Sequence, residues 1–236
     1  MSRDWVARGR SGRFSATPAL AMTSPALDEF QERVVLAAQS ASPTVRLVGG
    51  AGLALLLGHR VSEDLDLFCA PREDVGGVVR AVIASAEAGG AVVTPVRTGP
   101  GFQRLELVGV HGTVRVDIAA DTAERLEPAP VLVGSVRAET LRDQRANKLI
   151  ALLGRSELRD LVDLFFIENA GYPAVAGFVD AVAKDGGMDP AWFAWALGQI
   201  AIRPLPGLVA ALDLGALERF RDRLQRDVLT LAAPQR

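Results

Sequence analysis

The stretch that decides the fold runs Leu47-Val48-Gly49-Gly50-Ala51 and, after a short apolar segment, continues as Ser62-Glu63-Asp64-Leu65-Asp66-Leu67-Phe68. Apolar and β-branched residues before the glycines predict a strand, residues 53–57 predict a helix, and residues 65–68 predict a second strand. Glycines let a phosphate approach the backbone, and a helix that starts there directs free amides at the anion. This unit predicts an α/β fold with a phosphate-binding turn.

Asp64 and Asp66 lie two residues apart on the second predicted strand. Their side chains therefore share one face, while Leu65 and Leu67 enter the core. Two carboxylates on one face suit Mg²⁺ or Mn²⁺, which substrate phosphates commonly complete. Taken alone, an Asp-x-Asp is typical of a solvated strand end, and a Gly-Gly of an ordinary turn. Their combination in one unit favours a nucleoside triphosphate held against a metal.

Asp117 is a third candidate carboxylate. In residues 114–118 the apolar side chains face one way, and Arg115 and Asp117 face the other. If this strand pairs beside that of Asp64 and Asp66, three carboxylates converge on two metals about 3.5–4 Å apart. The alternative is a surface Asp117 paired only with Arg115.

The rest of the chain divides into an α/β half and a helical half. Ser24 and Pro25 predict a helix start, with that helix reaching about Ala41. Other elements of the first half are a helix over 74–88 and strands over 44–48, 91–96, 103–108 and 113–118. The second half predicts a short strand over 131–133 and helices over 138–153, 157–169, 174–184, 190–202 and 214–231. We predict a flexible extension over 1–23, an α/β (α+β) domain over 24–130 and a helical domain over 131–236.

The composition excludes several classes of protein. With 49% hydrophobic and 23% charged residues, the 236-residue chain is globular rather than disordered. Its longest apolar run is far below the ~20 residues of a membrane-spanning helix, so we expect no membrane partner. A single cysteine, Cys69, excludes an internal disulfide and predicts a reducing, cytoplasmic location. The net charge of −2 requires any nucleic-acid footprint to be local.

Lys148 and Lys184 are the only lysines among 26 basic residues. At 100° steps along its predicted helix, Lys148 falls inside the apolar sector. A compact ammonium group at this position can bind a triphosphate as a point charge. The alternative is a lysine whose alkyl chain lies along apolar surface while its ammonium group stays in water. Lys184 is interpreted as an ordinary charge at a helix C-terminus.

Asp163 is the only charged residue within 161–167. A carboxylate in such a run is expected to be partly buried and to need a cation, for which Lys148, Arg145 and Arg159 are candidates. The alternative is a salt bridge that only holds two helices together. His59 and His111 are interpreted as loop residues rather than as a metal pair.

In their order and spacing these motifs resemble the AbiEii/AbiGii toxin family, nucleotidyltransferases of the DNA polymerase β superfamily. The resemblance covers about residues 45–168. It rests on residues 48–51, 58–68, 116–118, 148–152, Arg155 and residues 159–164. It implies a polymerase-β-like domain with a mixed sheet, followed by a helical subdomain.

The resemblance also implies an activity, which is transfer of a nucleoside monophosphate from a nucleoside triphosphate to an acceptor hydroxyl. Some members modify the 3′ end of tRNA and are held in check by an antitoxin encoded alongside. The implied active-site residues are Asp64, Asp66, Asp117, Lys148, Asp160 and Asp163, with Gly49, Gly50, Ala51, Arg60 and Arg155 as substrate contacts. We expect Asp117 to help the acceptor hydroxyl lose its proton and Lys148 to offset charge on the pyrophosphate.

Ala51 departs from the family pattern, which usually places threonine or serine after the glycines. A hydroxyl at that position can contact phosphate, whereas here only backbone amides remain. Three hypotheses therefore stand. The first is a metal-dependent nucleotidyltransferase with Mg²⁺ or Mn²⁺ at Asp64, Asp66 and Asp117, and the second is a nucleotide-binding or antitoxin-binding module of the same fold without turnover. The third is a structural scaffold that binds neither triphosphate nor divalent metal.

Overall fold

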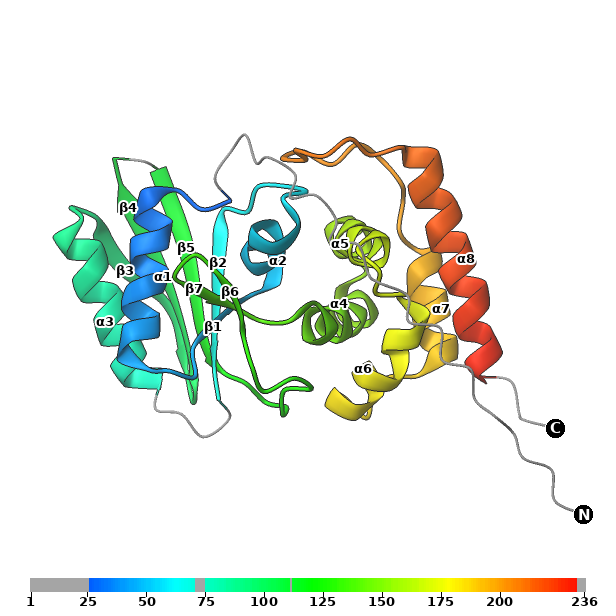
Figure 1. Cartoon of the computed structure of the whole chain (residues 1–236), viewed down its shortest axis with the longest axis horizontal. Coiled ribbons are helices and arrows are strands. Elements are labelled where there is room, and N and C mark those ends of the chain that lie inside the picture. Colours follow the sequence, from blue (N-terminus) through cyan, green and yellow to red (C-terminus); the bar gives the residue numbers. More distant parts are fainter. Residues whose placement is uncertain (1–25, 71–74, 111, 233–236) are drawn as a thin grey trace, which may run out of the picture.

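The computed structural model describes residues 26–70, 75–110 and 112–232, in which an α/β unit adjoins a group of helices (Figure 1). The expected extension over 1–23, the helix start at Ser24 and Pro25, and His111 lie outside the described residues. The first described helix is α1 (Glu29–Ala41), and Asp28 is its N-cap residue. The Asp28 carboxylate accepts a hydrogen bond from the backbone N–H of Gln31 at 2.8 Å, and the Gln31 side chain accepts one from the backbone N–H of Asp28 at 3.1 Å. This capping box fixes the helix start.

Among the described residues, seven strands form one mixed sheet in the order β3-β4-β5-β2-β1-β7-β6. β2 runs parallel to β5 and β1 parallel to β7, while the other neighbours are antiparallel. The strands are β1 (Arg46–Val48), β2 (Asp64–Cys69), β3 (Val92–Gly99), β4 (Phe102–Gly109), β5 (Gly112–Ala120), β6 (Val131–Val133) and β7 (Val136–Ala138). The predicted mixed sheet is confirmed.

Strand β6 lies at the predicted residues 131–133, whereas β7 differs from the sequence prediction. Ala138 was expected to begin a helix, but it ends β7 and pairs with Leu47 of β1. Helix α4 (Leu141–Arg155) starts later because the Thr140 side chain accepts a hydrogen bond from the backbone N–H of Asp143 at 3.2 Å. Two strands that follow the expected boundary at residue 130 therefore belong to the sheet, and the helical part begins at α4.

The two faces of the sheet carry different side chains. Helices α1 and α3 (Val75–Ala88) cover one face, where Leu65 and Leu67 are fully buried. Helix α2 (Gly49–Leu57) lies on the other side, between the sheet and helices α4 and α5 (Leu158–Asn169) (Figure 1). The period of two in β2 thus directs Asp64 and Asp66 toward the helical part of the chain.

The helical part has its own core, formed by α4, α5, α6 (Phe178–Lys184), α7 (Pro190–Gly198) and α8 (Leu214–Ala232), with a 3-10 turn at Val175–Gly177. Helix α7 is shorter than the predicted 190–202. Residues 199–213 run back to the α/β unit instead, where the Val61 N–H donates to the Gly207 carbonyl and the Val209 N–H to that of His59, both at 2.9 Å. Of the helices described, none has the length and hydropathy that crossing a bilayer demands.

Candidate active site

Most of the residues singled out by the sequence meet at a central cavity of about 170 Å³, whose lining does not include Ala51, Asp160 and Asp163. Its walls combine the glycines that open α2, carboxylates from β2 and β5, and basic side chains from both parts of the chain. The lining residues are Gly49, Gly50, Arg60, Ser62, Asp64, Asp66, Arg104, Arg115, Asp117, Lys148, Arg155 and Arg159. Basic residues outnumber acidic ones here, although the whole chain has a net charge of −2.

Gly49 and Gly50 bring the start of α2 against the charged side chains of the cavity. Gly49 has a φ of +62°, and a Cβ at this position would collide with the Asp66 carboxylate. A Cβ at Gly50 would collide with the Arg60 guanidinium. In the described structure no side chain caps α2, so its first backbone N–H groups are available to an anion in the cavity.

Asp64, Asp66 and Asp117 project from neighbouring strands into this cavity. The parallel pairing of β2 with β5 places Asp66 directly beside Asp117, which is the strand arrangement that the sequence hypothesis required. Burial, with the negative charges of Asp117 and Asp64, raises the pKa of Asp66 from 3.8 to about 6. A divalent cation relieves such repulsion, and carboxylate oxygens are the ligands that Mg²⁺ and Mn²⁺ prefer.

Two arginines contact these carboxylates. Arg104, from β4, donates through Nε and Nη2 to the two oxygens of Asp117 at 2.7 and 2.6 Å. Arg115 Nη1 lies 3.6 Å from Asp64 Oδ2. Within the described ranges, no three His, Cys, Asp or Glu residues are grouped so that they could hold a metal ion. The donor chemistry fits a cation at Asp64 and Asp66, whereas a third ligand requires Arg104 to release Asp117.

Lys148 reaches the cavity from α4, and its side chain is only 8% exposed. Its Nζ lies 2.9 Å from Asp160 Oδ1 and 2.7 Å from Asp163 Oδ2. Burial disfavours the ammonium, but the charges of Asp163 and Asp160 raise the pKa of Lys148 above its ordinary value. The lysine is therefore charged, and α5 fixes its position at the edge of the cavity.

Asp163 is fully buried and also binds the loop that precedes β2. It accepts hydrogen bonds from Arg60 Nε at 2.7 Å and Nη2 at 3.0 Å, and lies 2.7 Å from His59 Nε2. Burial favours the neutral acid, yet Lys148, His59 and Arg60 together hold the pKa of Asp163 well below its usual range. Asp163 therefore connects α4 and α5 to the α/β unit.

Asp160 is the second fully buried carboxylate of α5. It accepts hydrogen bonds from Arg155 Nε at 2.7 Å and Nη2 at 2.8 Å as well as from Lys148. The two aspartates thus orient three cations, Lys148, Arg60 and Arg155, around one cavity.

Residues 33–233 match the family model described as nucleotidyl transferase AbiEii toxin, type IV TA system. The chain belongs to this family. No match was found among curated proteins.

Two solved structures from Helicobacter pylori share the fold of this AbiEii protein. JHP933 is 17% identical with a TM-score of 0.54, and the alignment covers 85% of this chain and 91% of that chain. A second structure, described as a candidate nucleotidyltransferase, is 19% identical with a TM-score of 0.54 and coverages of 85% and 94%. The fold is that of the polymerase-β-like nucleotidyltransferases.

Some candidate residues of the AbiEii protein lie elsewhere than expected. Ala51 does not line the central cavity, because its side chain is fully buried in the hydrophobic core of the α/β unit. A hydroxyl at position 51 would therefore enter this core. The expected partners Arg145 and Arg159 bind other carboxylates, Asp180 at 2.8 Å and Glu157 at 2.6 Å.

His59 and Lys184 correct two sequence interpretations. His59 is not merely a loop residue: it is fully buried against Asp163, and its ring lies 4.9 Å from that of Phe166. Lys184 is not a solvated helix-end charge, since its side chain is 3% exposed and its Nζ lies 2.6 Å from Asp143. Arg104 was missed altogether, although its position in the strand before Asp117 was a usable signal.

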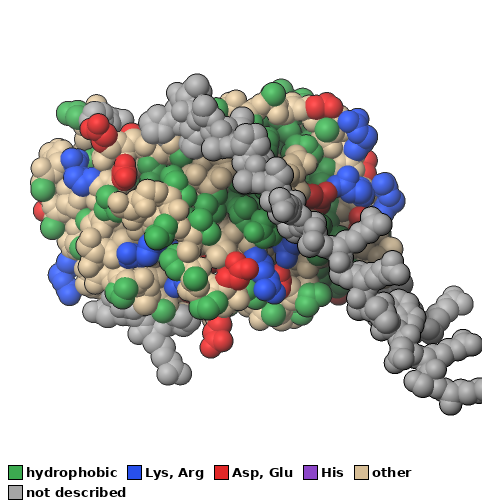
Figure 2. Space-filling model, in the orientation of Figure 1, with side chains coloured by type: hydrophobic (Ala, Val, Ile, Leu, Met, Phe, Trp, Pro, Cys, Tyr) green, Lys and Arg blue, Asp and Glu red, His purple; other side chains and the backbone are tan. Residues whose placement is uncertain are grey.

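Basic side chains do not gather into one large patch on the face seen in Figure 2. There the Lys and Arg side chains of the described residues are interspersed with Asp and Glu. Among the ion pairs of the described residues, Arg219 of α8 pairs with Asp213 at 3.4 Å and Arg221 with Asp222 at 2.8 Å. The lining of the central cavity, by contrast, contains more basic than acidic side chains.

Proposed function

We propose that this AbiEii protein transfers a nucleoside monophosphate from a nucleoside triphosphate to an acceptor hydroxyl, acting as the toxin of a toxin–antitoxin pair. The observation that carries the proposal is the central cavity, where a glycine-bearing helix start, three carboxylates and three fixed cations lie together. The family membership supports it. The cognate antitoxin is the expected protein partner, and the 3′ end of tRNA is the expected acceptor.

Triphosphate binding follows from the arrangement of positive groups. The backbone N–H groups at Gly49 and Gly50 would cradle phosphate oxygens at the start of α2. Arg60 and Arg155 would bind phosphate through their planar forks, and Lys148 would act as a point charge. Because Asp160 and Asp163 fix these cations before substrate arrives, little reorganisation is needed when negative charge develops.

In the proposed reaction, the oxygen of the acceptor hydroxyl bonds to the α-phosphorus, and the bond from that phosphorus to the bridging oxygen of the β-phosphate breaks. Pyrophosphate leaves with the electron pair of this bond, and Lys148 offsets its charge. The proton of the hydroxyl passes to Asp117, which faces the cavity beside Asp66. A Mg²⁺ or Mn²⁺ ion held by Asp64 and Asp66, and by Asp117 once Arg104 releases it, would supply Lewis-acid stabilisation of the phosphates.

One observation favours a second function, a nucleotide-binding or antitoxin-binding module without turnover. Arg104 engages both oxygens of Asp117, and no three-residue metal group forms among the described residues. If Arg104 never releases Asp117, the triphosphate would bind while the third metal ligand stays blocked. Calorimetry combined with a pyrophosphate assay separates the two functions, since the module binds triphosphate and releases no pyrophosphate.

The test of the proposed activity is a transfer assay with the full chain. The protein is incubated with each α-labelled nucleoside triphosphate, Mg²⁺ and total tRNA or cell protein, and label in the acceptor is counted. We expect one nucleotide to label an acceptor. Asp66→Asn should lower the rate about 10²–10⁴-fold, because it removes a cation ligand at the reacting phosphate.

Glu87→Gln is the matched control, since it removes an exposed carboxylate on α3, on the far side of the sheet from the cavity. It should label at the wild-type rate. The proposal fails if no combination of nucleotide and acceptor is labelled, or if Asp66→Asn labels as fast as wild type.

A further inference from the structure

His59 immediately precedes Arg60 of the central cavity but does not itself line that cavity. Its imidazole ring is fully buried, and Nε2 lies 2.7 Å from Oδ1 of Asp163. The other ring nitrogen, Nδ1, is also buried and has no hydrogen-bond partner among the described residues. A protonated ring would bury a charged N–H without an acceptor, which costs more than the unpaired neutral nitrogen of a ring protonated on Nε2 alone. His59 therefore donates one hydrogen bond to Asp163 and adds no charge to the site.

His59 differs from the other two side chains that contact Asp163 in the described part of the chain. Oδ1 of Asp163 also accepts from Arg60 Nε at 2.7 Å, and Oδ2 contacts Arg60 Nη2 at 3.0 Å and Lys148 Nζ at 2.7 Å. Arg60 and Lys148 line the central cavity, so a triphosphate bound there would attract both of them away from the carboxylate. The hydrogen bond from His59 does not compete with substrate. It therefore holds the carboxylate in place while the two cations turn toward phosphate.

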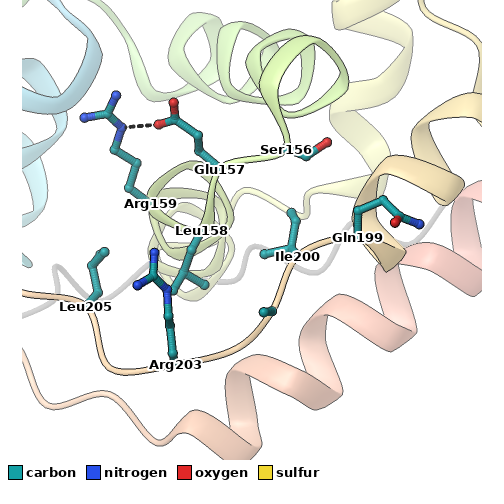
Figure 3. A pocket seen from close by; sticks show the side chains of 9 residues that line it. Ser156, Glu157, Leu158, Arg159, Gln199, Ile200, Arg203 and Leu205 are labelled. Atoms are coloured by element: carbon teal, nitrogen blue, oxygen red, sulfur yellow. Dashed lines mark ion pairs between the residues drawn. The ribbon is translucent and has the colours of Figure 1, made fainter.

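The helical part of the chain fixes His59 through its side chain and through its backbone. The imidazole ring packs against the ring of Phe166 on α5, with the centroids 4.9 Å apart. The His59 carbonyl accepts the backbone N–H groups of Val209 and Ala210 at 2.9 and 3.0 Å. These two residues end the segment that follows α7, whose first part borders an outer cavity of about 400 Å³ together with the start of α5 (Figure 3). The direction of Nε2 toward Asp163 is thus set from several sides.

We propose that His59 is a positioning residue of the transfer reaction, whose Nε2–H fixes the Asp163 carboxylate and thereby aims Lys148 and Arg60 at the triphosphate. The inference rests on the proposed function, because these two cations act on the rate only if a triphosphate reacts in the central cavity. His59 touches neither the substrate nor the reacting atoms. It acts through Asp163, and a displacement of about 1 Å in a group that aligns substrate can lower a rate about 10²-fold.

Two substitutions separate the hydrogen bond of His59 from the packing of its ring. His59→Leu removes the donor and keeps an apolar side chain against Phe166, whereas His59→Gln carries an amide N–H as far along the side chain as Nε2. Single-turnover transfer at saturating triphosphate should be about 10–10²-fold slower in His59→Leu and within about threefold of wild type in His59→Gln. Calorimetry with unreactive α,β-methylene triphosphates should give a Kd within about threefold of wild type for both, because Lys148 and Arg60 keep their charges.

Labelled lysine gives a readout that does not depend on turnover. Because the chain has only two lysines, ¹³Cε-lysine produces separate NMR signals for Lys148 and Lys184, which Lys148→Met assigns. His59→Leu should broaden the Lys148 signal and shift it toward its position in urea, where no carboxylate holds the ammonium. The Lys184 signal should stay unchanged, since this lysine pairs with Asp143. His59→Gln should restore the Lys148 signal of the wild type.

Gln39→Leu is the matched control, because it also removes a buried donor, one that bonds the Arg137 carbonyl at 2.7 Å from α1 on the other face of the sheet. It should lower stability in urea and leave the transfer rate and the Lys148 signal unchanged. The proposal is overturned if His59→Leu keeps the wild-type rate or the wild-type Lys148 signal, if His59→Gln is as impaired as His59→Leu, or if Gln39→Leu changes the Lys148 signal equally. Where His59→Leu does not fold, His59→Asn replaces it, because its amide ends one bond short of the Nε2 position.

The two kinds of measurement separate the role of His59 from the proposed function. If the wild-type chain labels no acceptor with any nucleotide, the transfer activity is wrong, and the Lys148 signal alone decides whether His59 positions this lysine. If the wild-type chain labels an acceptor and His59→Leu labels it equally fast, His59 is not a positioning residue and the transfer activity stands.

Discussion

The two lysines of this protein lie in two buried charge clusters, and in each cluster carboxylates compensate the burial of the ammonium group. Lys148 is 8% exposed and pairs with Asp160 and Asp163, and Lys184 is 3% exposed and pairs with Asp143. A buried ammonium without a carboxylate costs several kcal/mol, so both clusters stabilise their lysine in the same way. Burial and pairing alone therefore do not distinguish a functional lysine from a structural one.

The Lys148 cluster has a surplus of positive charge. Lys148, Arg60 and Arg155 outnumber the two buried carboxylates that hold them, Asp160 and Asp163, although Arg155 also lies 3.8 Å from the exposed Glu157; all three cations line the central cavity. Because the surplus faces an open cavity, an anion can neutralise it. This cluster is consequently suited to bind phosphate.

The Lys184 cluster has a surplus of negative charge and serves the fold. Lys184 faces Asp143 at 2.6 Å and Glu139 at 3.7 Å. Asp143 also accepts the backbone N–H groups of Leu126 and Glu127 at 2.9 and 3.0 Å. The cluster thus fastens the connection between β5 and β6 to α4 and α6. The sign of the unbalanced charge in a buried cluster, and whether that charge faces a cavity, therefore indicates the role of the cluster.

Removing the structural lysine should give the largest difference between the two clusters. Lys184→Met leaves Asp143 and Glu139 without their cation, and we expect the free energy of unfolding to fall by about 3–5 kcal/mol. The transfer rate per folded molecule should stay within about twofold of wild type, because Lys184 does not line the central cavity. Urea unfolding and the transfer assay below the unfolding transition measure the two effects. A large loss of rate without loss of stability would contradict the comparison.

Removing the other lysine should give the opposite pattern. Lys148→Met deletes the point charge at the phosphate cradle, and we expect the transfer rate to fall about 10²–10³-fold, equivalent to roughly 3–4 kcal/mol of transition-state stabilisation. Stability should fall less than in Lys184→Met, because Arg60, Arg155 and His59 still pair with Asp160 and Asp163. A Lys148→Met protein that keeps the wild-type rate in single-turnover measurements would place the lysine among structural residues.

Local patterns predicted the parts of the site that lie within one unit of sequence. The period of two in β2 placed Asp64 and Asp66 on one face, and the glycines marked the start of α2. Asp117 required only one further assumption, the pairing of β5 beside β2, which the structure confirms. The helix position of Lys148 in the apolar sector likewise indicated its burial.

Contacts between distant segments were the part that sequence could not predict. Lys184 is buried because the connection after β5 folds over it, and no local pattern reports that contact. Arg104 reaches Asp117 only through the register of β4 with β5. The three-residue strand β7 gave no periodicity to detect, because its pairing with β1 decides its conformation.

The smallest expected effect concerns the negative surplus of the Lys184 cluster. Burial raises the pKa of Glu139 from 4.5 to about 7, although the charge of Lys184 opposes the shift. Between these two pH values the folded protein binds a proton that the unfolded chain has released, so stability falls as pH rises through this window. Glu139→Gln removes that titration and keeps an oxygen for the Asn147 amide, which donates to Glu139 at 2.9 Å in the wild type.

We therefore expect Glu139→Gln to flatten the dependence of stability on pH. The difference from wild type should be near zero at about pH 4 and grow to at most about 3 kcal/mol in favour of the variant above about pH 7, since one pKa unit corresponds to 1.36 kcal/mol. Part of the slope will remain, because the pKa of Asp66 is also raised, to about 6. The double variant with Asp66→Asn should remove that part as well. The test is to measure the urea midpoint of wild type and of Glu139→Gln across this pH range. Parallel curves of midpoint against pH would show that the surplus charge of the Lys184 cluster is not on Glu139.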